Sequence, residues 1–252
     1  MLAKTPHPLN MLVEHIPGEL IAYPQWVGWC YEQRQGKWTK VPINPHTGRQ
    51  ARSNDPTTWA PFEIALVRAQ RDHLAGVGFV FTDGDPYAGV DLDRCRHPET
   101  GEIAAWAEEI IASLQTYTEI SPSGTGVKSF IHASIPRGGN RTGQIELYDH
   151  GRYFTLTGHH VAGTPSTIEA RQSIIETLHA RLFPTPLPVQ RSCTDDHRPR
   201  RGTKVLADDA LLAQAMAARN GVHFAQLWHG DITGYASHSE ADLALCALLA
   251  YW

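Results

Sequence analysis

The 252-residue sequence lacks the features that mark several specialised classes of protein. It has no run of 18 apolar residues, so we expect no membrane-spanning helix. Its first twelve residues contain prolines and a histidine instead of the continuous apolar core of a signal peptide. The four cysteines are scattered without a C-x-x-C pair, which is typical of reduced thiols in a cytoplasmic protein and not of a disulfide framework.

The chain also lacks an excess of positive charge, because 22 Lys and Arg residues stand against 26 Asp and Glu, for a formal net charge of −4. This value excludes a uniformly basic coat for nucleic acid, although a local basic groove stays compatible with it. The fourteen histidines show no H-E-x-x-H or comparable metal-binding spacing, and we find no internal repeat. With 42% hydrophobic and 19% charged residues, the composition is that of an ordinary globular protein.

What the chain does contain is a mixture of short strands and amphipathic helices, which predicts a mixed α+β fold. Alternating or apolar runs bounded by turn residues predict strands over residues 26–32, 37–43, 77–81, 87–93, 117–120, 127–132, 144–148 and 153–157. Asp55-Pro56 is typical of a helix start, and the spacing of apolar residues predicts a second helix over 103–115. Ser166 and Glu169 form a capping box that predicts a third helix, ending near Phe183.

Composition divides the chain into three parts. Residues 1–185 hold the α+β pattern, and residues 186–205 are rich in proline and arginine, as linkers are. Residues 206–252 are helical in pattern, with a last helix from Ser237 that is apolar on nearly all sides and therefore needs burial. We interpret this tail as the truncated N-terminal part of a helical bundle.

The first chemical feature is the segment 89–93, in which Asp91 and Asp93 lie two residues apart on a predicted strand. Residues at this spacing point to the same face, so the two carboxylates would lie side by side and favour a cation between them. Oxygen ligands select Mg²⁺ or Mn²⁺, and such a pair can hold the two metal ions that polymerases use. The alternative is a pair of solvated turn acids.

Two further features follow along the chain. The segment 121–128 (S-P-S-G-T-G-V-K) offers small residues, hydroxyls and Lys128 to a phosphate, although taken alone it is more typical of a plain hairpin loop. Glu146 lies between apolar residues of a predicted strand, where a carboxylate is either ion-paired or bound to a metal. Arg152 follows the next turn and could clamp a phosphate or pair with Glu146.

The order of these features resembles that of the archaeo-eukaryotic primases, most closely the primase–polymerases encoded by phages and plasmids. The resemblance covers about residues 26–158, including the segments 36–42, 53–59, 76–81 and 152–158. Residues 224–252 are similar to the helical domain that follows in those proteins. The resemblance implies two αβ subdomains that flank a cleft, one of them like an RNA-recognition motif.

The resemblance also implies residue roles. Metal ligands would be Asp91, Asp93 and Glu146, with Asp149 a less favoured substitute. The residues around the nucleotide triphosphate would be Ser121, Ser123, Gly124, Lys128 and Arg152. A template or nucleotide groove would be lined by Lys37, Lys40 and Arg52, although these could also be solvated surface residues. One position departs from the family pattern: Lys128 stands where a histidine is usual.

The implied activity is template-directed nucleotidyl transfer with Mg²⁺ or Mn²⁺. Its partners would be a single-stranded DNA template and primer, dNTP or NTP, and a helicase domain or protein, in the cytoplasm of a prokaryotic host of a phage or plasmid. With an incomplete helical domain, we expect primer extension but poor synthesis without a primer. Two other classes share the acidic residues: a non-catalytic single-stranded DNA-binding replication initiator module, and a metal-dependent nuclease.

Overall fold

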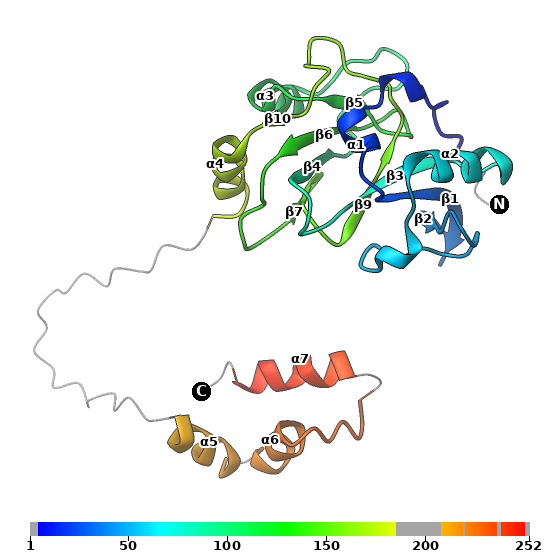
Figure 1. The fold of residues 1–252 in the computed structure, drawn as a ribbon. Coiled ribbons are helices and arrows are strands. Elements are labelled where there is room, and N and C mark those ends of the chain that lie inside the picture. The colour runs from blue at the N-terminus through cyan, green and yellow to red at the C-terminus, as the bar shows by residue number, and fades with distance from the viewer. Residues whose placement is uncertain (1–4, 185–207, 219, 236–237, 250–252) are drawn as a thin grey trace, which may run out of the picture. The chain divides into compact units, whose positions relative to one another are not determined.

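The computed structural model describes residues 5–184, 208–218, 220–235 and 238–249 (Figure 1). The chain divides into two compact units, Met1–Val189 and Gln190–Trp252, which are treated separately below. The first unit contains two largely antiparallel sheets with helices packed against them, so the predicted mixed α+β class is confirmed. The predicted linker, residues 186–205, lies outside the described residues.

The first sheet has the strand order β2-β1-β3-β9, and all its pairs are antiparallel. Its strands are β1 (Trp26–Arg34), β2 (Lys37–Ile43), β3 (Gly76–Phe81) and β9 (Arg152–Leu156). Strands β1 and β2 form a hairpin in which Arg34 pairs with Lys37. The two residues between them, Gln35 and Gly36, have φ values of 49° and 77°, as a type I′ turn requires.

Helix α2 (Phe62–Arg71) packs on this sheet through Phe62, Ala65 and Ala69. The predicted helix start at Asp55 was wrong in part. Asp55 caps only the short 3-10 helix η2 (Pro56–Thr58), because Ala60 then exchanges two backbone hydrogen bonds with Trp26 and breaks the helical path. The short helices η1 (Val13–His15) and α1 (Gly18–Ile21) precede the sheet.

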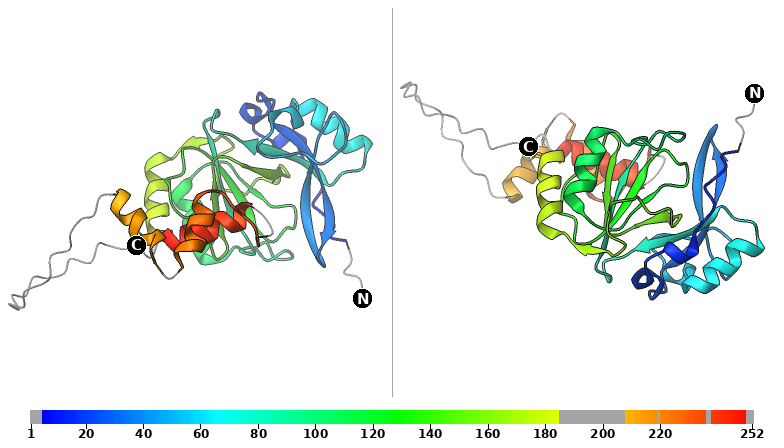
Figure 2. Two further views of the ribbon diagram at one scale, coloured as in Figure 1. Left: turned by 90° about the horizontal axis from the view of Figure 1, so that it is seen from below. Right: turned by 90° about the horizontal axis from the view of Figure 1, so that it is seen from above.

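The second sheet has the order β10-β6-β4-β8-β7, and β5 also pairs with β6. Its strands are β4 (Tyr87–Leu92), β5 (Thr118–Ile120), β6 (Val127–His132), β7 (Arg141–Thr142), β8 (Ile145–Tyr148) and β10 (Glu169–Ala170). Helices α3 (Ala105–Leu114) and α4 (Gln172–Leu182) lie side by side against one face of this sheet (Figure 2). Val90 and Leu92 of β4 point into that helix-covered core.

The predicted capping box at Ser166 was wrong. Glu169 lies in β10, which pairs in parallel with β6, and its N–H donates to the Thr116 hydroxyl. Helix α4 begins only at Gln172, after this strand has ended. Pairing of residues 169–170 with the distant strand β6 is therefore favoured over the helix start that the local sequence predicts.

The other face of the second sheet packs on the first sheet through aromatic side chains. Phe81 and Phe154 of the first sheet contact Phe130 of β6 at ring-centroid distances of 5.9 and 5.8 Å. Gly89 of β4 lies beneath Phe154, so close that a Cβ atom at residue 89 would lie 2.2 Å from the ring. Glycine is therefore required here to bring the two sheets together.

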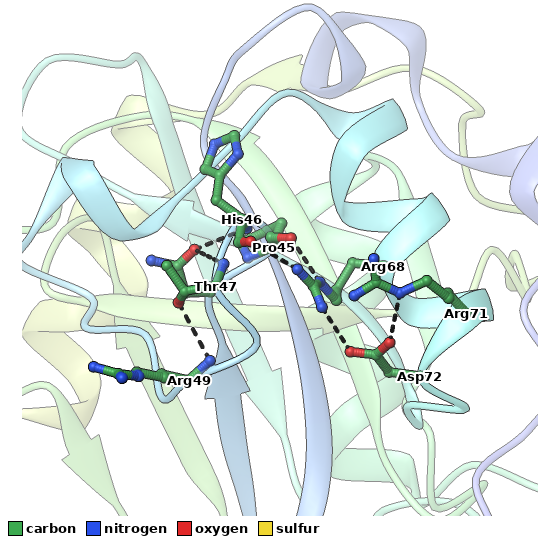
Figure 3. Close-up of polar contacts among 8 residues, drawn as sticks. Pro45, His46, Thr47, Arg49, Arg68, Arg71 and Asp72 are labelled. Atoms are coloured by element: carbon green, nitrogen blue, oxygen red, sulfur yellow. Dashed lines mark hydrogen bonds and ion pairs between the residues drawn. The ribbon is translucent and has the colours of Figure 1, made fainter.

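A turn over residues 44–49 follows β2 and is fixed by Arg68 of α2 (Figure 3). The Arg68 guanidinium donates to the carbonyl oxygens of Pro45 and His46, both at 2.7 Å, and pairs with Asp72 at 2.9 Å. The chain then returns along β2, where the Ala51 N–H donates to the Pro42 carbonyl at 2.8 Å. Arg68 thus fixes the segment that leads into residues 50–54.

The second unit contains helices α5 (Asp208–Met216), α6 (Gly221–Trp228) and α7 (His238–Leu249). Helix α6 contacts both of the others, and Phe224 and Leu227 are buried. Ser237, the predicted start of the last helix, lies outside the described residues. Among the helices of the described segments, none is long and apolar enough to cross a membrane.

Candidate active site

Five charged side chains lie in one line across the second sheet, and we call them the charged row. Strand register pairs Asp91 with Lys128 on one side and with Glu146 on the other. Glu119 pairs with Lys128, and Arg141 pairs with Glu146. Because directly paired residues point to the same face, the row runs Glu119, Lys128, Asp91, Glu146, Arg141 on the face away from α3 and α4.

Ion pairs within the row engage one oxygen each of Asp91 and Glu146. The Lys128 ammonium pairs with Asp91 Oδ2, and the two side chains are 4% and 16% exposed. At the other end, Arg141 Nε lies 3.0 Å from Glu146 Oε1. Asp91 Oδ1 is buried and has no hydrogen-bond partner among the described residues. A buried oxygen of this kind is costly unless a ligand or ion satisfies it.

Four members of the row, Lys128, Asp91, Glu146 and Arg141, line a cleft of about 560 Å³ within the first unit, whereas Glu119 is buried beside it. This volume is within the range of small-molecule sites. Six of the site residues that the sequence predicted line it, from both sheets and the 50–54 segment: Lys40, Arg52, Asp91, Lys128, Glu146 and Arg152. The structure therefore brings together residues that lie up to 112 positions apart in the sequence.

The cations of the cleft come from different elements. Burial and, to a smaller extent, the nearby Lys128 charge lower the pKa of Lys40 to about 8, although Asp91 and Asp93 oppose the shift. Arg52 and Arg152 are exposed. The Arg152 guanidinium lies 5.0 Å from the centre of the Tyr148 ring, and the Arg52 carbonyl accepts a hydrogen bond from Trp59 at 2.6 Å. Both arginines line the cleft.

Asp93 lies one residue beyond the end of β4, where its N–H donates to the Gln144 carbonyl at 2.8 Å. Burial raises the pKa of its carboxyl, and the negative charges of Asp91 and Glu146 add to this shift. A divalent cation would relieve this crowding of carboxylates. In the described part of the chain, no three His, Cys, Asp or Glu side chains form a ready metal-binding cluster by themselves.

The serine- and glycine-rich loop lies beside the end of β4, but it does not line the cleft. Its hydroxyls hydrogen-bond one another, from Ser121 to Ser123 at 3.1 Å and from Ser123 to Thr125 at 2.8 Å. Gly124 has a φ of 74°, and a Cβ atom on Gly126 would lie 2.6 Å from the Leu92 carbonyl oxygen. The contact of this loop with a triphosphate stays a prediction.

Two other predicted residues lie apart from the cleft. Lys37 is exposed near the tip of the β1–β2 hairpin. Asp149, the substitute ligand, accepts a hydrogen bond from the Ile135 N–H at 2.7 Å and contacts His150 at 2.6 Å. These contacts give Asp149 a role in fixing the loop after β6.

Sequence reasoning missed two members of the charged row, Glu119 and Arg141. Glu119 lies between Thr118 and Ile120 of β5 and is fully buried. A carboxylate between residues of a predicted strand was the signal that singled out Glu146, and it would have found Glu119 as well. Arg141 lies in the two-residue strand β7, which has no pattern of its own to detect.

These features define a mixed α+β protein in which a carboxylate pair, flanked by cations, forms the floor of a cleft between two sheets. No family model matches the sequence. The chain is similar to the DNA primase-polymerase of Nitratiruptor phage NrS-1, with 33% identity over 178 residues. The match covers 68% of this chain and 24% of that protein, so the similar region spans about a quarter of the relative's length.

Proposed function

We propose that the first unit catalyses template-directed nucleotidyl transfer, as a primase–polymerase of the archaeo-eukaryotic type. The observation that carries the proposal is the direct pairing of Asp91 and Glu146 on neighbouring strands, in a cleft that also holds Lys40, Arg52 and Arg152. The similarity to the phage DNA primase-polymerase supports it. Solvated turn acids, the alternative for the segment 89–93, would be more exposed than Asp91, whose side chain is 16% exposed.

The residues that would hold divalent metal ions are Asp91 and Glu146, with Asp93 beside them. They fit Mg²⁺ or Mn²⁺, because Mg²⁺ in polymerase sites takes one or two carboxylates and completes its shell with substrate phosphates and water. Asp91 Oδ1 is buried and has no hydrogen-bond partner within residues 5–184 and the other described segments, and it is a ligand atom of the right kind. When bound, two such ions supply activation of a 3′-hydroxyl and neutralisation of the leaving pyrophosphate.

The chain's own cations would bind and orient the nucleotide. Arg152 and Arg52 offer exposed guanidinium groups, which match phosphate oxygens bidentately. Lys40 of β2 adds a further positive charge to the lining of the cleft. The loop that holds Ser121, Ser123 and Gly124 would donate hydrogen bonds to the triphosphate after the bond between its Ser121 and Ser123 hydroxyls breaks. Holding reactants and charges in place supplies much of the rate in phosphoryl transfer.

The remaining parts of the proposal concern partners. A single-stranded DNA template with its primer, and dNTP or NTP, would enter the cleft, and the helical second unit would correspond to the domain that follows the catalytic module in these proteins. A helicase domain or protein would be a further partner. Replication of a phage or plasmid is the process in which such an enzyme would act.

The test is primer extension on a DNA template with Mg²⁺ or Mn²⁺. We expect Asp91→Asn and Glu146→Gln to lower dNTP incorporation by at least about a hundredfold, because each removes a charge from the reacting centre. Asp83→Asn is the matched control, since this aspartate is 89% exposed and does not line the cleft. Full activity of the Asp91 variant would refute the assignment. DNA binding without incorporation by the unmodified protein would favour a binding module instead.

A further inference from the structure

Lys128 occupies an unusual place for a residue expected to bind a triphosphate. Its side chain is only 4% exposed, and its ammonium lies 4.3 Å from the centre of the Phe154 ring. The same ammonium pairs with Asp91 Oδ2. The charge is therefore enclosed between an aromatic ring and a carboxylate, whereas Arg52 and Arg152 present their charges openly.

The strand order gives Asp91 a different neighbour on each side. Lys128 on β6 neutralises one oxygen, and Glu146 on β8 adds negative charge on the other side. Asp91 Oδ1 keeps no partner among the described residues. Lys128 thus holds one oxygen of the Asp91 carboxylate, while the other oxygen is buried without a hydrogen-bond partner among the described residues.

We propose that Lys128 is a positioning residue, an internal counter-ion that holds Asp91 in place and weakens the affinity of the site for a divalent cation. The proposal rests on the metal site of the proposed function and assigns Lys128 a role other than contact with the triphosphate. A buried carboxylate that loses its cation is strongly destabilising. Separating the Lys128 ammonium from the Asp91 carboxylate therefore costs free energy. A fixed positive charge beside a ligand also repels an incoming divalent ion.

The substitution Lys128→Met keeps an unbranched side chain, one heavy atom shorter, and removes its charge. We expect the metal-free variant to melt at a lower temperature than the unmodified protein, since Asp91 becomes a buried unpaired charge. We expect its dissociation constant for Mn²⁺, measured by calorimetry without nucleotide, to fall on the order of tenfold. Mn²⁺ should therefore raise the melting temperature of the variant more than that of the unmodified protein.

Two further variants separate this role from general damage. In the Asp91→Asn background a neutral amide replaces the carboxylate. Adding Lys128→Met to this variant should therefore cause little further loss of stability. If Lys128→Met alone fails to fold without metal, Mn²⁺ should restore its folding. Arg141→Met removes the other cation next to an acidic member of the row, but from a side chain that is 64% exposed, and should scarcely change the melting temperature.

The outcomes are distinct. Unchanged or weaker Mn²⁺ binding by Lys128→Met would overturn the role of Lys128, and a loss confined to nucleotide affinity would assign it to the triphosphate. Equal destabilisation by Lys128→Met in the presence and absence of the Asp91 charge would also overturn it. If the unmodified protein binds no Mn²⁺, the metal site itself fails, and the proposed function fails with it.

Discussion

Glu119 of β5 accepts a hydrogen bond from the backbone N–H of Gly158, at 2.9 Å, and so ties the second sheet to the end of the first. Its carboxylate also accepts from the Thr157 N–H and the Tyr117 hydroxyl, each at 2.9 Å. The side chain is fully buried. Burial raises the pKa of Glu119 to about 7, although the three donors favour its charged form.

This raised pKa predicts a pH dependence of stability. Between pH 4.5 and about pH 7 the folded protein keeps the Glu119 proton that the unfolded chain has released. The free energy of unfolding should therefore fall as the pH rises through this window, by about 3 kcal/mol from this group. Urea denaturation across the window should show this contribution to the slope, and Glu119→Gln should remove it, leaving the smaller contribution of Asp93, whose pKa is also raised. Glu63→Gln, an exposed glutamate on α2, should keep it.

Arg68 and Arg71 offer a second comparison, since both pair with Asp72 but differ in their other contacts. Arg68 is 11% exposed and holds two carbonyl oxygens of the 44–49 turn, whereas Arg71 is 62% exposed (Figure 3). We expect Arg68→Met to lower the free energy of unfolding by about 2–3 kcal/mol. Arg71→Met should change it by less than about 0.5 kcal/mol. Equal effects in denaturant titrations would contradict this reading of the turn.

Two buried threonines should respond in opposite directions to the same substitution. The Thr155 hydroxyl has no hydrogen-bond partner among the described residues, so Thr155→Val should raise the free energy of unfolding by about 1 kcal/mol. The Thr118 hydroxyl pairs with that of Ser129 at 2.8 Å, and Thr118→Val should lower it by about 1–2 kcal/mol. Thermal melting of the two variants measures both changes. A destabilised Thr155→Val would show that its hydroxyl has a structural partner.

The packing of Phe154 over Gly89 gives a further prediction. In Gly89→Ala the new methyl group meets the ring, so the sheets must separate or the ring must move. We expect a loss of about 3 kcal/mol in the free energy of unfolding. Gly84→Ala is the control, because the nearest atom to its Cβ would be 3.7 Å away, and its effect should stay below about 1 kcal/mol. Similar melting temperatures for the two variants would be inconsistent with the close approach.

The sequence predicted the strands well because their signals are local. Alternation and turn residues placed β6 and β8 within one residue of their observed bounds. The errors arose where distant pairing overrides a local cap, as at Asp55, where Ala60 bonds to Trp26, and at Glu169, which joins β6. Such competition depends on the tertiary fold and leaves no mark in a short window of sequence.

The candidate site was predictable to a similar extent. The types and spacing of residues singled out Asp91, Lys128 and Glu146, and the structure places them side by side. That Lys128 faces Asp91 instead of open solvent follows from strand order and register, which the sequence pattern does not contain. The environment of Glu119 likewise depends on the tertiary fold, because its neighbours come from β6 and from the residues after β9.

The charged row has a consequence for how this chain can vary. On β4, Val90 and Leu92 enter the helix-covered core, and Asp91 between them enters the cleft. Inserting or deleting a single residue in this strand would therefore exchange the two environments, with acid driven into the core and aliphatic side chains into the cleft. The alternation along β4 thus serves both the core and the cleft. Insertions and deletions are therefore expected to be tolerated in the loops and not in this strand.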